Sequence, residues 1–223
     1  MKEDTEECYL CGKKDISTRD HIPPKGLFLS PAPSNLITVP SCESCNKSYE
    51  LDDEYLRVFL SSRPNRNTIA KQIWDEKVVG KTFRRSPKLR EVLSRTIRTS
   101  ELHTPAGIYI GKLYSVDWLG KRLRREFERI VRGLYLHEMG LRLPSGLRFD
   151  FWDQSDFNIQ NEIIHVYATA TERTIGTGEV FVYRYHVAPD DLSLGIWWLL
   201  FYRSTIVCGI HEHSANLEEA IGQ

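Results

Sequence analysis

The chain has 223 residues, of which 41% are hydrophobic and 27% are charged, as is typical of a soluble globular protein. Its N-terminus has no apolar segment, and its longest apolar run, Leu194–Tyr202, is far shorter than the roughly 20 residues that cross a bilayer. We therefore expect a cytoplasmic protein without a membrane partner, in a reducing compartment where paired cysteines more often bind metal than form disulfides.

A formal net charge of zero conceals an uneven distribution of charge along the chain. Residues 1–56 hold 6 basic and 11 acidic groups, residues 57–132 hold 19 and 7, and residues 133–223 hold 5 and 12. A basic middle segment of this kind is typical of a surface that binds a polyanion. The alternative is a set of solvated helix faces, which most charge runs are.

The first sixty residues predict a β-hairpin followed by a helix. Residues 17–22 form a short strand that two prolines end, and residues 35–39 alternate as the second strand of the hairpin. Ser41 is expected to cap a helix that runs to about residue 61. With a cysteine knuckle in front, this order of elements is a treble-clef arrangement.

Two Cys-x-x-Cys pairs frame the predicted hairpin. Cys8 and Cys11 precede it, and Cys42 and Cys45 share one face of the first turn of the helix. Four thiolates around one ion form a closed structural site, so we expect these cysteines to hold Zn²⁺. Two unrelated pairs, or redox dithiols, are the alternative. The remaining Cys208 is expected to be a buried apolar side chain.

Start and stop signals predict three helices and a strand in the middle of the chain. A helix capped by Asn67 or Thr68 reaches about residue 79, and a second begins at Ser86-Pro87. Residues 107–116 alternate as a strand. The third helix begins after Asp117 and ends at Gly140.

This third helix, residues 117–139, has a clear apolar stripe from Leu119 to Leu134, with cations over the rest of its surface. The cations expected to contact phosphate are Arg122, Arg124, Arg125 and Arg129. The competing account is that these arginines pair with the acidic C-terminal segment.

After residue 144 the pattern favours strands at 147–152, 162–169, 179–187 and 196–210, which would form four or five antiparallel strands packed on the third helix. The predicted fold class is α+β. The expected domains are a treble-clef module (1–62), a basic helical connector (63–106) and an α+β C-terminal domain of unknown role (107–223).

Three polar residues in the first module could carry chemistry. Asp20 and His21 end the first strand, and Asn46 lies in the first helical turn, which the zinc would bring opposite the strand. A carboxylate and an amide oxygen can hold Mg²⁺ or Mn²⁺, and an imidazole can take a proton from an attacking water. Taken singly, Asp20 would be interpreted as a surface carboxylate, His21 as a structural histidine and Asn46 as a polar residue at the start of a helix.

Together, these motifs resemble the HNH, or ββα-metal, endonucleases. The matching residues are Asp20-His21, Asn35-Leu36 and Cys42-x-x-Cys45-Asn46, framed by Cys8-x-x-Cys11. The resemblance is strongest to the four-cysteine, zinc-bearing subgroup that includes McrA-type restriction enzymes and phage endonuclease VII. It covers about residues 5–60.

The resemblance implies a role for each matched residue. His21 would be the general base, Asp20 and Asn46 would hold the catalytic ion, and Asn35 would fasten the loop behind the histidine. Many members have a lysine three residues after the last asparagine, where this chain has Tyr49. Phosphate contact is therefore expected from Lys25 or Lys47.

The expected function is metal-dependent cleavage of phosphodiester bonds in DNA, with RNA as the other substrate that the sequence allows. Two alternatives stay open. One is a zinc-bound nucleic-acid-binding module that has lost catalysis, and the other is a nuclease controlled by a ligand- or partner-sensing C-terminal domain. The sequence leaves the oligomeric state open, a dimer included.

Overall fold

The computed structural model describes residues 6–63, 65–116, 118, 120–153 and 161–213, and its structure is mixed α and β, as predicted. The strands are β1 (Thr18–Ile22), β2 (Ile37–Ser41), β3 (Ile97–His103), β4 (Tyr109–Val116), β5 (Arg148–Asp153), β6 (Thr171–Ile175), β7 (Phe181–Ala188), β8 (Asp191–Phe201) and β9 (Thr205–Glu212).

The helices follow the same order of the chain. They are the 3-10 turn η1 (Lys25–Leu27), α1 (Glu43–Ser48), α2 (Glu50–Ser62), α3 (Thr68–Gln72), the π-helical η2 (Ile73–Thr82), α4 (Phe83–Arg85), α5 (Pro87–Thr96), α6 (Gly120–Met139) and α7 (Asn161–Thr169). Among the described residues, none of these helices combines the length and the apolar character that a membrane crossing requires.

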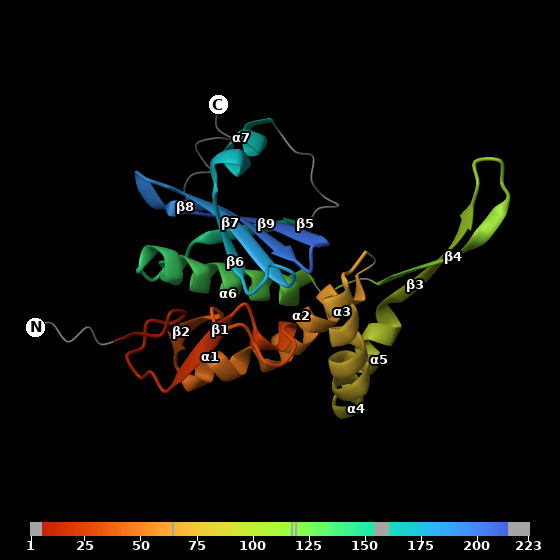
Figure 1. Ribbon diagram of the computed structural model, residues 1–223, viewed down its shortest axis with the longest axis horizontal. Coiled ribbons are helices and arrows are strands. Elements are labelled where there is room, and N and C mark those ends of the chain that lie inside the picture. Colours follow the sequence, from red (N-terminus) through yellow and green to blue (C-terminus); the bar gives the residue numbers. More distant parts are fainter. Residues whose placement is uncertain (1–5, 64, 117, 119, 154–160, 214–223) are drawn as a thin grey trace, which may run out of the picture.

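Helix α6 is the central element of the fold (Figure 1). On one side it covers the antiparallel sheet, whose strand order is β5-β9-β8-β7-β6. On the other side it packs against α2 and the β1–β2 hairpin. The β3–β4 hairpin forms a separate two-stranded sheet that extends away from this body.

One hydrophobic core joins the two sides of α6. Its buried side chains include Tyr9 and Ile22 from the N-terminal segment, Phe127 from α6 and Trp197 from the sheet. The approach is closest at Gly133 of α6, where an added Cβ would lie 2.5 Å from a side-chain carbon of Ile22. The core therefore contains side chains from all three of the expected domains, residues 1–62, 63–106 and 107–223. The division of the chain into these three domains stays a prediction.

Elements with strong local signals occur where the sequence predicts them. The side chain of Asn67 accepts a hydrogen bond from the backbone N–H of Ala70 and caps α3, and Pro87 begins α5. Helix α6 ends at Gly140, whose φ of +68° is the left-handed conformation that glycine favours. The predicted cap Asp117 and the stripe residue Leu119 lie outside the described residues.

Two predictions of secondary structure are wrong. Residues 162–169 belong to helix α7 rather than to a strand, although the segment is rich in apolar and β-branched residues. Ile97 falls at helical spacing after Leu93 and is predicted to belong to the helix that begins at Ser86-Pro87, but that helix ends at Thr96, and Ile97 begins β3 and is 47% exposed. Short apolar segments do not separate helix from strand by periodicity alone, so tertiary contacts decide.

The buried His211 of β9 gives the fold a dependence on pH. Its side chain is fully buried, and its Nδ1 accepts a hydrogen bond of 3.1 Å from Trp197 Nε1. Burial lowers the pKa of His211 to about 4. Below the ordinary pKa near 6.5 the unfolded chain binds this proton more readily than the folded chain does. Stability is therefore lost as the pH falls from about 6.5 towards 4.

We expect the free energy of unfolding of the wild type to fall between pH 7 and pH 4, by an amount that reaches roughly 3 kcal/mol at the acid end. Urea unfolding at several pH values measures this change. His211→Phe removes the titrating group and should flatten the decline, whereas His213→Ala, at an exposed histidine two residues away, should retain it. The same decline in His211→Phe as in the wild type would assign the acid sensitivity to other groups.

Candidate metal centre and the polar network beside it

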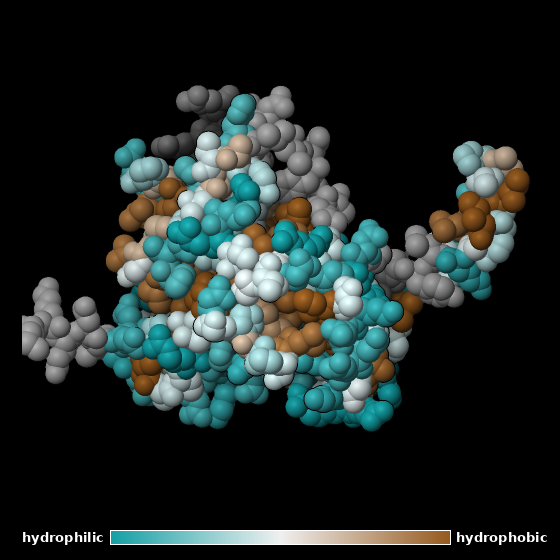
Figure 2. Space-filling view, viewed as in Figure 1, coloured by the Kyte–Doolittle hydropathy of each residue, from teal (hydrophilic) through white to brown (hydrophobic). Residues whose placement is uncertain are grey.

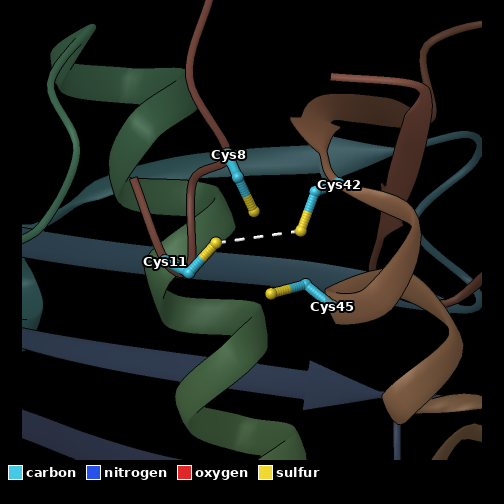
Figure 3. Close-up of side chains that lie close together, drawn as sticks. All are labelled: Cys8, Cys11, Cys42 and Cys45. Carbon is cyan, nitrogen blue, oxygen red and sulfur yellow. Dashed lines mark hydrogen bonds between the residues drawn. The ribbon is translucent and has the colours of Figure 1, made fainter. Parts of the chain in front are cut away.

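Four cysteine side chains converge between the N-terminal knuckle and helix α1 (Figure 3). The sulfur atoms of Cys8, Cys11, Cys42 and Cys45 all lie within 4.8 Å of one another, and those of Cys11 and Cys42 are 3.7 Å apart. In a tetrahedral site with Zn–S bonds of 2.3 Å, the sulfurs are about 3.8 Å apart. The cluster therefore has the dimensions to hold a metal ion such as zinc.

The electrostatics of the cluster also fit a cation. Hydrogen bonds from the Ser44 hydroxyl and the Cys45 backbone N–H lower the pKa of Cys42 to about 6. Burial raises the pKa of Cys45, and the neighbouring thiols raise it further. Thiolates this close together repel one another, so a cation between them would relieve the repulsion.

Local backbone hydrogen bonds position both cysteine pairs. In the knuckle, the N–H of Gly12 donates to the carbonyl of Cys8 at 2.8 Å, and Gly12 has a φ of +74°. At the other pair, Cys42 rather than Ser41 is the N-cap of α1. The expected cap was one residue early because Ser41 still belongs to β2, where it pairs with Thr18.

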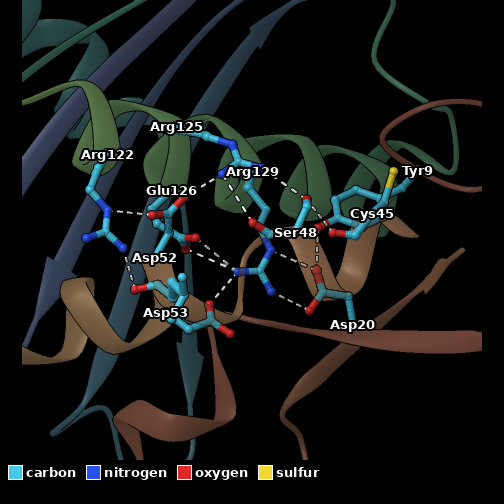
Figure 4. A network of polar contacts seen from close by, with 11 residues as sticks. Tyr9, Asp20, Cys45, Ser48, Asp52, Asp53, Arg122, Arg125, Glu126 and Arg129 are labelled. Carbon is cyan, nitrogen blue, oxygen red and sulfur yellow. Dashed lines mark hydrogen bonds and ion pairs between the residues drawn. The ribbon is translucent and has the colours of Figure 1, made fainter. Parts of the chain in front are cut away.

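Asp20 lies at the centre of a buried polar network that links β1, α2 and α6 (Figure 4). Its carboxylate is 3% exposed and accepts from Tyr9 Oη at 2.6 Å, from Arg129 Nε at 2.8 Å and from Arg129 Nη2 at 2.5 Å. Arg129 is itself 1% exposed and also pairs with Asp53 and Glu126. Three of about four acceptor positions on the Asp20 carboxylate are thus used within the protein.

His21 and Asn46 are placed differently. Successive residues of a strand face opposite sides, so the His21 side chain lies on the other side of β1 from Asp20. His21 is half-buried, and burial together with the charge of Lys25 lowers its pKa, which keeps the imidazole neutral at pH 7. Asn46 Nδ2 donates to Thr18 Oγ1 at 3.2 Å, so it approaches β1 near Asp20.

Asn35 contacts the C-terminal sheet. Its Nδ2 donates to the carbonyl of Thr174 at 3.0 Å, and its Oδ1 accepts from the backbone N–H of Gly176 at 2.8 Å. These two bonds fasten the loop before β2 to the turn between β6 and β7. The role behind His21 that the resemblance implies stays a prediction.

The arginines of α6 make contacts within the protein. Arg122 Nε pairs with Asp52 at 2.6 Å and Arg125 Nη1 pairs with the same carboxylate at 2.5 Å, while Arg124 donates to the carbonyl of Phe149 at 2.7 Å. The expectation that Arg129 contacts phosphate is corrected, because its buried guanidinium is enclosed by carboxylates. Arg122, Arg125 and Arg129 thus pair with carboxylates of α2, whereas Arg124 pairs with Asp150 of the C-terminal segment at 3.3 Å, so the competing account holds for Arg124 alone among these four arginines.

The two lysines proposed for phosphate contact lie at the surface. Lys25 is exposed at the start of η1. Lys47 is exposed on α1 and pairs with Glu43 at 2.5 Å.

Sequence reasoning missed the acidic face of α2. Asp52 and Asp53 are the partners of α6, and Glu54 accepts hydrogen bonds from Arg85 and Ser86. The signal in the sequence that could have indicated this face is the run of four acidic residues within positions 50–54, opposite in charge to the cationic helix α6.

A cleft of about 550 Å³ lies beside the acidic face of α2, between η1 and α2. Its lining residues include Gly26, Asp53, Glu54 and Arg57.

Comparison of the chain with protein-family models, curated proteins and solved structures finds no match.

Proposed function

We propose that this protein is a zinc-stabilised HNH-type endonuclease that hydrolyses phosphodiester bonds in DNA. The observation that supports the proposal best is the four-cysteine cluster, because it fastens the knuckle, the β1–β2 hairpin and α1 together. We read this as a treble-clef, ββα-metal module. The hairpin carries Asp20 and His21, and α1 carries Asn46, as the resemblance of the motifs requires.

In this proposal His21 is the general base. Its half-exposed imidazole has no hydrogen-bond partner among the described residues, and its lowered pKa leaves it ready to accept a proton from water at neutral pH. Asn46 Oδ1 and the remaining acceptor position of Asp20 are the groups that would hold Mg²⁺ or Mn²⁺. A bound divalent ion would polarise the phosphoryl group and stabilise the leaving oxygen.

The Asp20–Arg129 ion pair favours a second candidate. Because the carboxylate is buried and bound in a bidentate pair, its capacity for a metal ion is small in this arrangement. The second candidate is a zinc-bound module that binds nucleic acid without cutting it. The hydrogen bonds of Asn35 to Thr174 and Gly176 are consistent with the third alternative, in which the C-terminal part of the chain controls a nuclease.

A plasmid-nicking assay separates the two candidates. Purified protein is incubated with supercoiled DNA in Mg²⁺, in Mn²⁺ and in EDTA, and the zinc content is measured before and after. Cleavage only with an added divalent ion and with zinc retained supports the nuclease. Binding without cleavage under all three conditions supports the inactive module.

His21→Ala is expected to reduce cleavage by on the order of 10²-fold or more, because the reaction loses its general base. Zinc content and thermal stability should not change, since the imidazole lies on the open side of β1. The control is His137→Ala, which removes an exposed histidine of α6. Cleavage by His21→Ala at the rate of the wild type would remove this histidine from the mechanism.

A further inference from the structure

The β3–β4 hairpin is an arm that extends from the body of the protein without packing on it (Figure 1). Every residue of β3 is exposed. A strand of seven residues spans about 23 Å at roughly 3.3 Å per residue. An arm of this length reaches well beyond the surface from which it starts.

The end of the arm is both fixed in shape and apolar. The turn is closed by hydrogen bonds from the N–H of Gly107 to the carbonyl of Thr104 at 2.9 Å and from the N–H of Ile108 to Thr104 Oγ1 at 3.1 Å. Ile108 is 65% exposed and Ile110 is 64% exposed, and Figure 2 shows hydrophobic surface at the end of the arm. An apolar patch that the protein exposes in this way is typical of an interaction site.

Helices α3–α5 precede β3 in the chain and form the foot of the arm, and they carry positive charges that are not paired with carboxylates. Residues 63–98 contain 11 lysines and arginines and three acidic residues. Five of these cations are exposed and pair with no carboxylate among the described residues. They are Lys71, Lys81, Arg84, Lys88 and Arg90. This distinguishes the surface of α3–α5 from α6, where Arg122, Arg125 and Arg129 have carboxylate partners.

We propose that the arm and the cations of α3–α5 form the surface that binds duplex DNA. The cations contact phosphates on the outside of the duplex, while the arm enters a groove and places Ile108 and Ile110 against the base pairs. Apolar side chains of this kind act as wedges at base steps. The grooves are about 8 Å deep, so the arm can reach the base pairs while its foot stays at the backbone. The proposal depends on DNA as the partner in the proposed function, but not on cleavage.

Charge favours DNA over a second copy of the chain as the occupant. If two copies exchanged arms, each foot would bring a segment with a balance of +8 towards the other. Like charges in proximity oppose such a pairing, whereas phosphates neutralise them and release counterions. Self-association through the arm is therefore the outcome that the experiment must be able to detect.

The experiment measures binding of a labelled mixed-sequence duplex of 30 base pairs by fluorescence anisotropy, in EDTA and at several salt concentrations. Lys88→Glu/Arg90→Glu should weaken binding roughly tenfold or more and reduce the slope of log K against log salt by about two, because each phosphate contact contributes about 0.9. The control is Lys13→Glu/Lys14→Glu, which changes the net charge equally on the N-terminal knuckle and should bind as the wild type does.

Ile108→Ser/Ile110→Ser tests the arm itself. We expect roughly tenfold weaker binding with an unchanged salt slope, because apolar contacts and not phosphate contacts are lost. Leu141→Ser, at an exposed apolar residue that follows α6 and lies outside both the arm and α3–α5, is the control. Sedimentation velocity on the same proteins reports self-association. A change in oligomeric state without a change in DNA affinity would overturn the proposal and assign the arm to a second copy.

The nicking assay keeps this inference distinct from the proposed function. If the wild type cuts DNA and both test variants, Lys88→Glu/Arg90→Glu and Ile108→Ser/Ile110→Ser, bind DNA like the wild type, the proposed surface is wrong and the nuclease proposal stands. If the wild type binds duplex and does not cut, while the foot and arm variants lose affinity, the nuclease is wrong and the surface stands. No binding of duplex by the wild type would overturn the inference outright.

Discussion

Cys42→Ser is expected to release zinc and to unfold the protein well beyond the first sixty residues. Binding of a structural zinc ion contributes about 10–16 kcal/mol in small zinc domains, which is comparable to the total stability of a typical protein. The N-terminal segment shares its core with α6 and the sheet through Tyr9 and Ile22. Loss of the metal should therefore lower the thermal stability of the whole chain.

Two measurements test this expectation. The zinc content per chain should be close to one in the wild type and strongly reduced in Cys42→Ser, and circular dichroism should show the lower melting temperature. Cys208→Ala is the control, since this buried cysteine of β9 lies outside the cluster. Wild-type protein that contains no zinc would end the assignment. A C-terminal part that keeps its own transition in Cys42→Ser would show that the shared core is not cooperative.

The sequence predicts those elements whose signals are local. The hairpin, the cap at Asn67, the start at Pro87 and the end at Gly140 each depend on residues within one turn or one strand. The cysteine cluster is predictable for the same kind of reason, because ligand spacing and softness indicate a metal site without knowledge of the fold.

The partners of the charged residues could not be predicted in this way. Arg122 and Arg125 of α6 reach Asp52, which lies 70 or more positions earlier in the chain. A cationic helix face has the same sequence pattern whether it meets phosphate, water or an acidic helix. Only the packing of α6 on α2 shows that Arg122, Arg125 and Arg129 are already paired. The exposed cations that have no carboxylate partner among the described residues include five on α3–α5.

Arg129→Leu is expected to destabilise the protein by about 3–5 kcal/mol, the range found when one partner of a buried ion pair is removed. The substitution leaves Asp20, Asp53 and Glu126 facing one another without a cation. Burial already raises the pKa of Glu126 to about 8, against the opposing effect of Arg129. Urea unfolding at pH 7 measures the loss.

The matched control is Arg122→Leu, the same substitution on the same helix. Arg122 also pairs with a carboxylate of α2, but its side chain is 28% exposed, so we expect a loss of about 1 kcal/mol or less. Equal losses in the two variants would show that burial of Arg129 does not determine its contribution.

Asp20→Asn combined with Arg129→Leu then separates the structural role of Asp20 from the proposed metal role. If the ion pair is the main role of Asp20, the double variant should be more stable than Arg129→Leu, because it no longer buries that unpaired carboxylate. If Asp20 also binds a divalent ion, Mn²⁺ should raise the melting temperature of Arg129→Leu, in which the carboxylate is released, and not that of the double variant. An equal response of both variants to Mn²⁺ would place the ion away from Asp20.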